Sequence, residues 1–226
     1  MKSFACFCAV AVSAVLLVIC QIAVITLTPV EAVMGPVQKI FYVHLPLAWW
    51  SLVSFGVTAT AGLVYLKRRD AASDRLAHAA AETGLVLNTL ALVTGSIWAR
   101  RSWGVWWTWD PRLTTALVLW FLYAGYLVLR RVDMPAPRRS AACAVMGILA
   151  FIDVPLVFLS ARLWRSIHPA VFASKGGGLE PEMLTGVLLS VGAFGVFWLL
   201  LLYWRTRIFT LSDELDRKKA QCTDNR

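Results

Sequence analysis

Charged side chains are scarce in this sequence of 226 residues: Asp, Glu, Lys and Arg make up 15% of it, against 59% hydrophobic residues. The charges cluster between long apolar stretches. This composition excludes a soluble domain, in which about a quarter of the residues are charged. The net charge of +9 does not indicate nucleic-acid binding, because the positive residues flank apolar segments, where membrane orientation explains them better.

The five cysteines form neither a C-x-x-C pair nor a C-x-x-C-H motif. The sequence therefore encodes neither a redox pair nor covalent haem attachment through its own thiols. Burial in apolar surroundings explains these cysteines. The chain also lacks a nucleotide-binding motif and repeated halves with broken helices, so active transport by this chain alone is not expected.

Six apolar stretches each approach the roughly 20 residues that a helix needs to cross a bilayer. They cover approximately residues 4–27, 47–66, 76–98, 113–129, 141–159 and 183–204. The first stretch is too long for the apolar part of a signal peptide, so we expect a retained membrane helix. We predict an all-α integral membrane protein with six transmembrane helices and a single membrane domain, residues 1–226, because the short connections leave no room for a soluble domain.

Lys and Arg are distributed unevenly over the two sides of the predicted bundle. The side that holds both termini carries 15 of them, and the other side carries 7. The cytoplasmic side of a membrane protein carries the excess of positive charge. Both termini should therefore be cytoplasmic, and the connection between the third and fourth helices should face outward, into the periplasm of a Gram-negative host.

This outward connection contains the stretch Trp103-Gly104-Val105-Trp106-Trp107-Thr108-Trp109-Asp110-Pro111-Arg112-Leu113-Thr114. Indole offers a broad apolar face with one N–H donor, which suits a flat and mostly apolar ligand. An aromatic belt at the membrane interface would account for many of the same rings. Trp103, Trp106 and Trp107 have helical spacing, but Gly104 and Pro111 favour a short amphipathic segment lying in the interface. Asp110 and Pro111 should cap and begin the fourth helix.

Two of the three histidines, His44 and His168, fall on the outward side. Neutral imidazole is a common axial ligand of haem iron, and the two axial positions lie on opposite faces of the ring, which suits ligands from separate segments. The alternatives are solvated interfacial histidines, or zinc ligands, for which two histidines without an outward cysteine are too few. Four outward arginines are candidate partners of haem propionates: Arg100, Arg101, Arg112 and Arg165.

Three polar residues interrupt the membrane segments: Glu82, Asn88 and Asp153. Such groups are costly in a bilayer and usually face the interior of a bundle or a cavity. Glu82 lies near the inner end of its helix, where it can simply reach water. Asp153 precedes Pro155 by two residues, which suggests either a cap or hydrogen bond in a proline-broken helix, or a part in ligand passage.

The tryptophan stretch resembles the W-G-x-x-W-x-W-D signature of the WWD-domain haem-handling superfamily. Within this superfamily the chain is most similar to the cytochrome c maturation protein C family (haem exporter protein C). The likeness spans nearly all six helices and includes Phe41–Pro46, Ala91–Ser96 and Val154-Pro155. Longer relatives, maturation protein F and the system II synthase, have an additional histidine pair within the membrane. In this chain the only histidine besides His44 and His168 is His78, which lies on the predicted cytoplasmic side.

The resemblance implies a protein that binds and presents haem and is not itself an enzyme, with no catalytic residues. The ligand would be b-type haem, bound non-covalently. His44 and His168 would be the axial ligands of the haem iron, and Trp103, Trp106, Trp107, Trp109 and Asp110 would form the haem platform.

The same resemblance implies a location and partners. The site would lie at the periplasmic face of the bacterial inner membrane. Haem would pass from it to a periplasmic haem chaperone (maturation protein E) for c-type cytochrome biogenesis by system I. A separate ABC-type ATPase and permease and a small membrane subunit (maturation protein D) would complete the assembly.

One departure from the family pattern concerns the second histidine. Many relatives have a polar residue after it and paired tryptophans before it, whereas Pro169 follows His168 here and Arg165 stands beside Trp164. Two other function classes stay open. One is a transporter that moves haem or another substrate along a path lined by Asp153 or Glu82. The other is a structural subunit that docks partners through the tryptophan stretch without binding haem.

Overall fold

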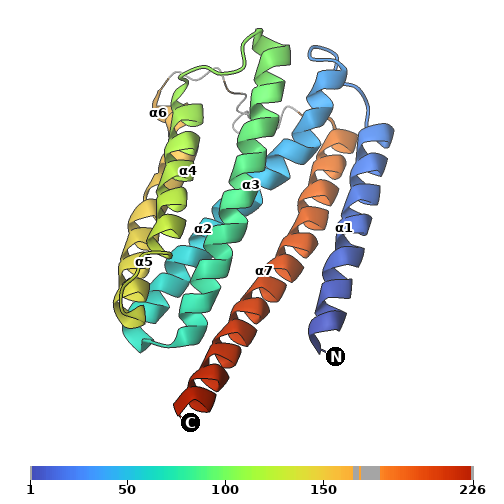
Figure 1. The fold of residues 1–226 in the computed structure, drawn as a ribbon. Helices are drawn as coiled ribbons and strands as arrows, with labels where there is room; N and C mark the ends of the chain where they lie inside the picture. Colours follow the sequence, from blue (N-terminus) through green and yellow to red (C-terminus); the bar gives the residue numbers. More distant parts are fainter. Residues whose placement is uncertain (1, 165–167, 169–178, 225–226) are drawn as a thin grey trace.

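The computed structural model describes residues 2–164, 168 and 179–224, and all regular elements within them are helices. Six helical segments are long and apolar enough to cross a bilayer, which confirms the predicted all-α fold with six spans. The elements are α1 (Lys2–Leu27), the short 3-10 helix η1 (Pro36–Ile40), α2 (Phe41–Arg68), α3 (Ala71–Trp103), α4 (Pro111–Leu129), α5 (Ala136–Phe151), α6 (Asp153–Leu163) and α7 (Pro181–Asp224) (Figure 1).

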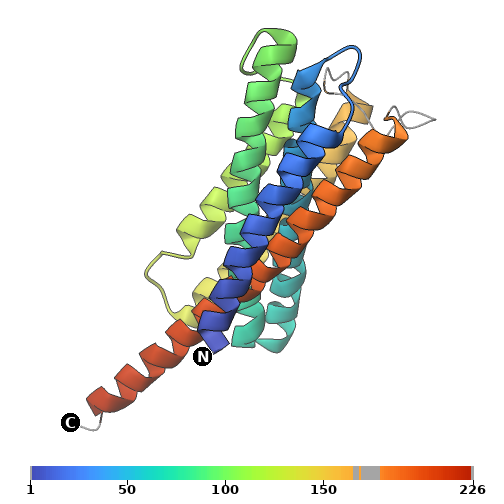
Figure 2. The same ribbon diagram turned by 90° about the vertical axis from the view of Figure 1, so that its right-hand side faces the viewer.

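Both ends of the described chain lie at the same end of the bundle (Figure 1). We call the opposite end the distal end; it holds η1, the α3–α4 connection and the start of α7. α2 and α3 pack against each other in the centre, α1 and α7 pair on one side, and α4, α5 and α6 cover the other. α7 has 44 residues and extends beyond the rest of the bundle at the end that holds the termini (Figure 2).

α2 and α3 approach each other closely because Gly84 of α3 faces α2. A Cβ atom at Gly84 would lie 2.7 Å from the ring of Phe55 and 2.8 Å from the Cβ of Ser54, so a side chain here requires the helices to move apart. At the start of α3, the Asp70 carboxylate accepts a hydrogen bond from the Ser73 backbone N–H at 2.8 Å. Hydrogen bonds from Ser73 lower the pKa of Asp70, which fits a carboxylate capping a helix.

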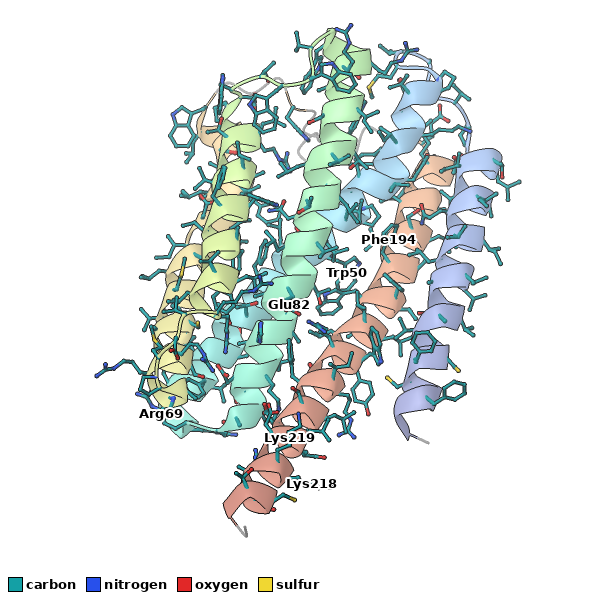
Figure 3. The ribbon with its side chains drawn as sticks, viewed as in Figure 1. Trp50, Arg69, Glu82, Phe194, Lys218 and Lys219 are labelled. Carbon is teal, nitrogen blue, oxygen red and sulfur yellow. The ribbon has the colours of Figure 1, made fainter. Side chains whose placement is uncertain are left out.

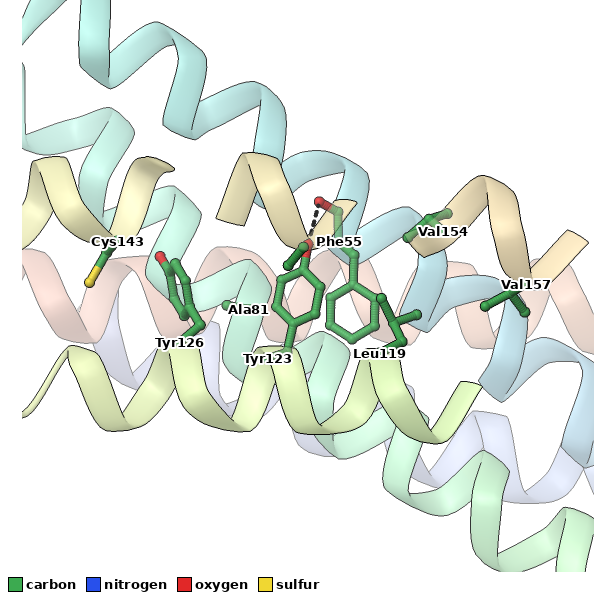
Figure 4. Close-up of a cluster of buried hydrophobic side chains, with 9 residues drawn as sticks. Phe55, Ala81, Leu119, Tyr123, Tyr126, Cys143, Val154 and Val157 are labelled. Carbon is green, nitrogen blue, oxygen red and sulfur yellow. Dashed lines mark hydrogen bonds between the residues drawn. The ribbon is translucent and has the colours of Figure 1, made fainter. Parts of the chain in front are cut away.

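Phe55 also belongs to a buried cluster that joins α2, α3, α4, α5 and α6 (Figure 4). Its ring stacks on the ring of Tyr123, with centroids 3.7 Å apart and an interplanar angle of 15°. The Tyr123 hydroxyl lies 3.4 Å from the Phe55 carbonyl oxygen and 3.3 Å from the Gly147 carbonyl oxygen, to which it can donate. This tyrosine therefore ties α4 to both α2 and α5.

Two tryptophans attach α7 to α2. The rings of Trp50 and Trp198 stack with centroids 4.7 Å apart. The Trp50 Nε1–H donates to the Val191 carbonyl at 2.9 Å, and the Trp198 Nε1–H donates to the Ser54 hydroxyl at 2.7 Å. Trp50 lies on the side of α2 that faces α7 (Figure 3). Both indoles are thus held by ring packing and by a hydrogen bond, which fixes them between the two helices.

Glu82 has a more specific role than reaching water. Its carboxylate pairs with the Arg205 guanidinium of α7 at 2.6 Å and lies 3.4 Å from His78 Nε2, one turn earlier in α3. The His78 ring stacks on Phe209, with centroids 4.3 Å apart. A charge inside a bilayer is costly unless it is paired. These contacts pair the charge of Glu82 and at the same time join α3 to α7.

α2 begins at Phe41, six residues before the expected start at position 47, and so includes His44 and Pro46. Pro46 is the sixth residue of α2, where its missing N–H removes one hydrogen bond, to the Tyr42 carbonyl, and the helix continues through it. The consequence is that His44 is carried by the first turn of a helix and not by a preceding loop.

The fifth expected span, residues 141–159, is divided into α5 and α6 at Ile152. Pro155 has no N–H to donate to the Phe151 carbonyl, and its ring would clash with that carbonyl in a continuous helix. Asp153 does not cap the new helix, because α6 has no side-chain cap, and Asp153 Oδ2 is buried without a hydrogen-bond partner within the described part of the chain. The cap proposed for Asp153 from the sequence is therefore wrong, although the proline break itself is confirmed.

We expect Gly84→Ala to destabilise the protein by roughly 1–3 kcal/mol, because the added methyl group overpacks the α2–α3 contact. Gly192→Ala in α7 is the matched control: a Cβ there meets no atom within 4 Å, and alanine is favoured over glycine in a helix by about 1 kcal/mol. Thermal unfolding in detergent measures both. Equal stability of the two variants would contradict the close α2–α3 packing.

Candidate functional site

A cavity of about 680 Å³ lies among α2, α3, α4, α6 and α7 towards the distal end, and we call it the histidine cavity. Both histidines singled out from the sequence, His44 and His168, line it, together with Trp98, Arg112 and Asn88 and a majority of aliphatic side chains. Ligand pockets for small molecules and cofactors have volumes of about 300–1,000 Å³ and are mostly apolar, with a few polar groups. The histidine cavity has this character.

The two histidine rings face one another across part of this cavity. Their centroids are 6.5 Å apart and their planes are inclined by 38°. A histidine nitrogen binds a metal ion at about 2.0–2.1 Å, so two imidazoles on opposite sides of one ion have centroids roughly 6–6.5 Å apart. The observed spacing therefore fits a single metal ion held between the rings.

Contacts from α3 orient the His44 ring. Its Nδ1 lies 3.1 Å from the Thr94 hydroxyl oxygen, and the same hydroxyl donates to the Leu90 carbonyl at 2.8 Å. The Thr94 oxygen therefore accepts from a protonated Nδ1, and the Ala91 carbonyl is a second acceptor for this ring. In a neutral imidazole with its proton on Nδ1, Nε2 carries the lone pair that a metal ion needs.

Two further residues of α3 shape the space around His44. Gly95 leaves room for the ring, because a Cβ atom there would lie 3.1 Å from His44 Cε1. Trp98 packs edge-on against His44, with centroids 5.9 Å apart and an interplanar angle of 72°. Sequence analysis gave neither residue, nor Thr94, a role in the site. Together with Ala91 they have the spacing i, i+3, i+4, i+7, which places all four residues on one face of a helix. This spacing is the feature of the sequence that could have indicated a shared role.

Arg112 is the one candidate arginine among the described residues that lines the histidine cavity. Its guanidinium Nη1 lies 3.5 Å from His168 Nδ1. The start of α4 fixes the Arg112 backbone: Asp110 Oδ1 accepts from the Arg112 backbone N–H at 3.0 Å, and Pro111 is the first residue of the helix. The predicted cap and helix start are confirmed. They bring a permanent positive charge to the cavity wall, where it can bind an anionic group.

Of the other candidates, Arg100 and Arg101 do not line the cavity. The Arg100 guanidinium donates to the Gly104 carbonyl at the end of α3. Arg101 is exposed to the surroundings. Arg165 lies outside the described residues.

The tryptophan stretch forms an irregular loop after α3. Trp103 ends α3, because Gly104 follows in the left-handed conformation with φ 78°, and residues 104–110 have no helical structure. Trp106 and Trp109 are 60% and 75% exposed. Trp107 packs edge-on against Trp109 at 6.0 Å, and its buried Nε1 has no hydrogen-bond partner within the described residues.

None of these four loop tryptophans lines the histidine cavity, whose tryptophans are Trp49 and Trp98. The loop nevertheless connects α3 directly to α4, and both helices line the cavity. The structure therefore brings together His44, His168 and Arg112 from the predicted site, and places the tryptophans in the α3–α4 connection at the distal end, with two indoles exposed.

A family model described as "Heme exporter protein C" matches residues 2–221 of the chain. The chain is 35% identical to the heme exporter protein C of Bradyrhizobium diazoefficiens, over 86% of this chain and 73% of the relative. It is 34% identical to the protein of the same name from Rhodobacter capsulatus, over 80% and 76% of the two chains. Identity to the Haemophilus influenzae protein of this name is 30%, over 84% and 78%.

We expect Thr94→Val to shift the tautomer ratio of His44 towards protonated Nε2 by up to about fivefold, since one neutral hydrogen bond contributes about 1 kcal/mol and the Ala91 carbonyl remains. Thr94→Ser keeps the hydroxyl and should keep the parent ratio. Nitrogen-15 NMR of histidine-labelled protein measures the ratio, and His44→Gln assigns the signal among only three histidines. Identical spectra for the valine and serine variants would contradict the role of the hydroxyl.

Proposed function

The chain belongs to the heme exporter protein C family, which implies haem handling in cytochrome c biogenesis, and from this premise we propose that it binds haem in the histidine cavity and presents it at the distal end of the bundle. The observation that carries the proposal is the 6.5 Å spacing of His44 and His168 inside a largely apolar cavity. In this proposal both imidazoles bind the haem iron from opposite faces of the ring.

The remaining features of the cavity suit the other parts of a haem molecule. Aliphatic side chains and Trp98 suit the apolar macrocycle, and Arg112 provides a guanidinium for a propionate. Thr94 supports the tautomer in which Nε2 of His44 binds the metal. Because the sequence has no C-x-x-C-H motif, we propose b-type haem, held without covalent bonds.

We further propose that the tryptophan loop extends this site towards a partner. Trp103, Trp106, Trp107, Trp109 and Asp110 would form the platform for haem that projects beyond the histidine cavity. The exposure of Trp106 and Trp109 supports this role, since large exposed apolar side chains are typical of binding surfaces.

The distribution of Lys and Arg favours a distal end in the periplasm and termini in the cytoplasm, in a bacterial inner membrane. The haem would then be presented to a periplasmic haem chaperone (maturation protein E) in system I. A separate ABC-type ATPase and permease would provide the energy, and a small membrane subunit (maturation protein D) would assist. The chain itself would hold and transfer haem without catalysing bond formation.

We expect detergent-purified protein loaded with haem to show a six-coordinate, low-spin visible spectrum, and His44→Ala and His168→Ala each to lose it, because each removes one axial ligand. His78→Ala is the matched control, since His78 contacts Glu82 and Phe209 and lies away from the cavity. An unchanged spectrum in either of the first two variants would remove that residue from the iron.

We expect Arg112→Gln to weaken haem binding about tenfold or more, as a hydrogen bond to a charged group contributes about 1.5–3 kcal/mol. Arg101→Gln, which removes an exposed arginine, should bind like the parent. Optical titration measures the affinity of each protein for haem and for haem dimethyl ester, and the difference between the two affinities reports the propionate contact. If the parent prefers free haem over the ester and Arg112→Gln retains that full preference, the propionate contact is excluded.

A further inference from the structure

A second hollow lies along α2, and we call it the membrane groove. It has a volume of about 650 Å³. It follows α2 from Trp49 to Val64, and the start of α3 and the α5–α6 region complete its walls, with Leu76, Phe151 and Phe158 among the lining residues. At 1.5 Å per residue this stretch of α2 is about 22 Å long, which covers most of a hydrocarbon core of about 30 Å.

The membrane groove and the histidine cavity are adjacent and share part of their walls. Three residues line both hollows: Trp49 and Leu52 of α2, and Phe158 of α6. Trp49 is 46% exposed and Phe158 is 43% exposed, so the wall that the two hollows share faces the surroundings of the bundle. Trp49 thus differs from the adjacent Trp50, whose ring is stacked and hydrogen-bonded against α7.

The proline break lies beside the place where the two hollows adjoin. α2 packs against α5, whereas α6, after the break at Ile152, packs against α4. The break before Pro155 thus turns the chain from α2 towards α4 close to Phe158, which lines both hollows.

From this shared wall we infer that the membrane groove is a lateral entry path, along which haem dissolved in the bilayer reaches the histidine cavity when the side chains between them move. The inference rests on the proposed function and adds the route of the ligand. Haem is a flat, mostly apolar molecule, and the side chains along the groove are nearly all apolar. Among the described residues, no histidine or arginine lines the groove, whereas His44, His168 and Arg112 line the adjacent cavity. Haem can therefore move along the groove and is retained only at the cavity.

The test fills the groove without touching the cavity. Thr60 lines the groove and is exposed, and within the described part of the chain its hydroxyl bonds only to the Gly56 carbonyl of its own helix. Thr60→Trp therefore narrows the path at little cost to the fold. Leu63→Trp is the matched control, because Leu63 is 49% exposed on the same helix but does not line the groove. Val64→Trp is a second variant that fills the groove.

Haem-free parent and variants are reconstituted into vesicles and mixed with vesicles that contain haem, and the loading rate is followed by absorbance. We expect Thr60→Trp and Val64→Trp to load at least tenfold more slowly than the parent, and Leu63→Trp to load at the parent rate. The final spectrum and the haem affinity in detergent should be the same for all four proteins, because a path changes the rate and not the equilibrium.

The outcomes separate the path from the function. Loading of both groove variants at the parent rate, with normal final spectra, overturns the entry path and leaves haem binding intact. A parent that binds no haem in vesicles or detergent overturns the proposed function and the path together. If Thr60→Trp loses a co-purifying membrane subunit while loading at the parent rate, the groove is a docking site for a partner helix and the path is wrong.

Discussion

The close packing of α2 against α3 is the contact on which the candidate site depends. Gly84 allows the two helices to approach until the backbone of α3 lies against Phe55 and Ser54. Towards the distal end of the same two helices, this close approach brings Thr94 within hydrogen-bond distance of His44, although the two residues are 50 positions apart in sequence. The imidazole is thus held by a hydroxyl, a carbonyl and an indole on one helix face, before any ligand binds. Such preorganisation reduces the conformational entropy lost on binding.

Much of this structure could be predicted from the sequence, because membrane spans depend on local composition. Twenty apolar residues in a bilayer have no stable alternative to a helix. The Asp110–Pro111 start of α4 was predictable for a similar reason, since capping involves only neighbouring residues. The pairing of His44 with His168 was also anticipated, since both residues lie on the side of the bundle that faces away from the termini.

The features that the sequence did not reveal depend on contacts between distant segments. Thr94 and Trp98 look like ordinary residues of a membrane helix, and only the position of α2 makes them neighbours of His44. Glu82 finds its partner Arg205 on α7, 123 residues later. Pattern and propensity carry no information on such pairs.

The length of α7 has a mechanical consequence. Its 44 residues form one rod of about 66 Å, roughly twice the thickness of a hydrocarbon core of about 30 Å. Leu184, Val187 and Val191, near one tip of this rod, form part of the wall of the histidine cavity, while the other tip projects beyond the bundle (Figure 2). The stacked pair Trp50 and Trp198 lies between them and holds α7 to α2, and Arg205, further along, pairs with Glu82 of α3. Because α7 is one continuous helix, the wall of the histidine cavity and the projecting tip belong to a single stiff element.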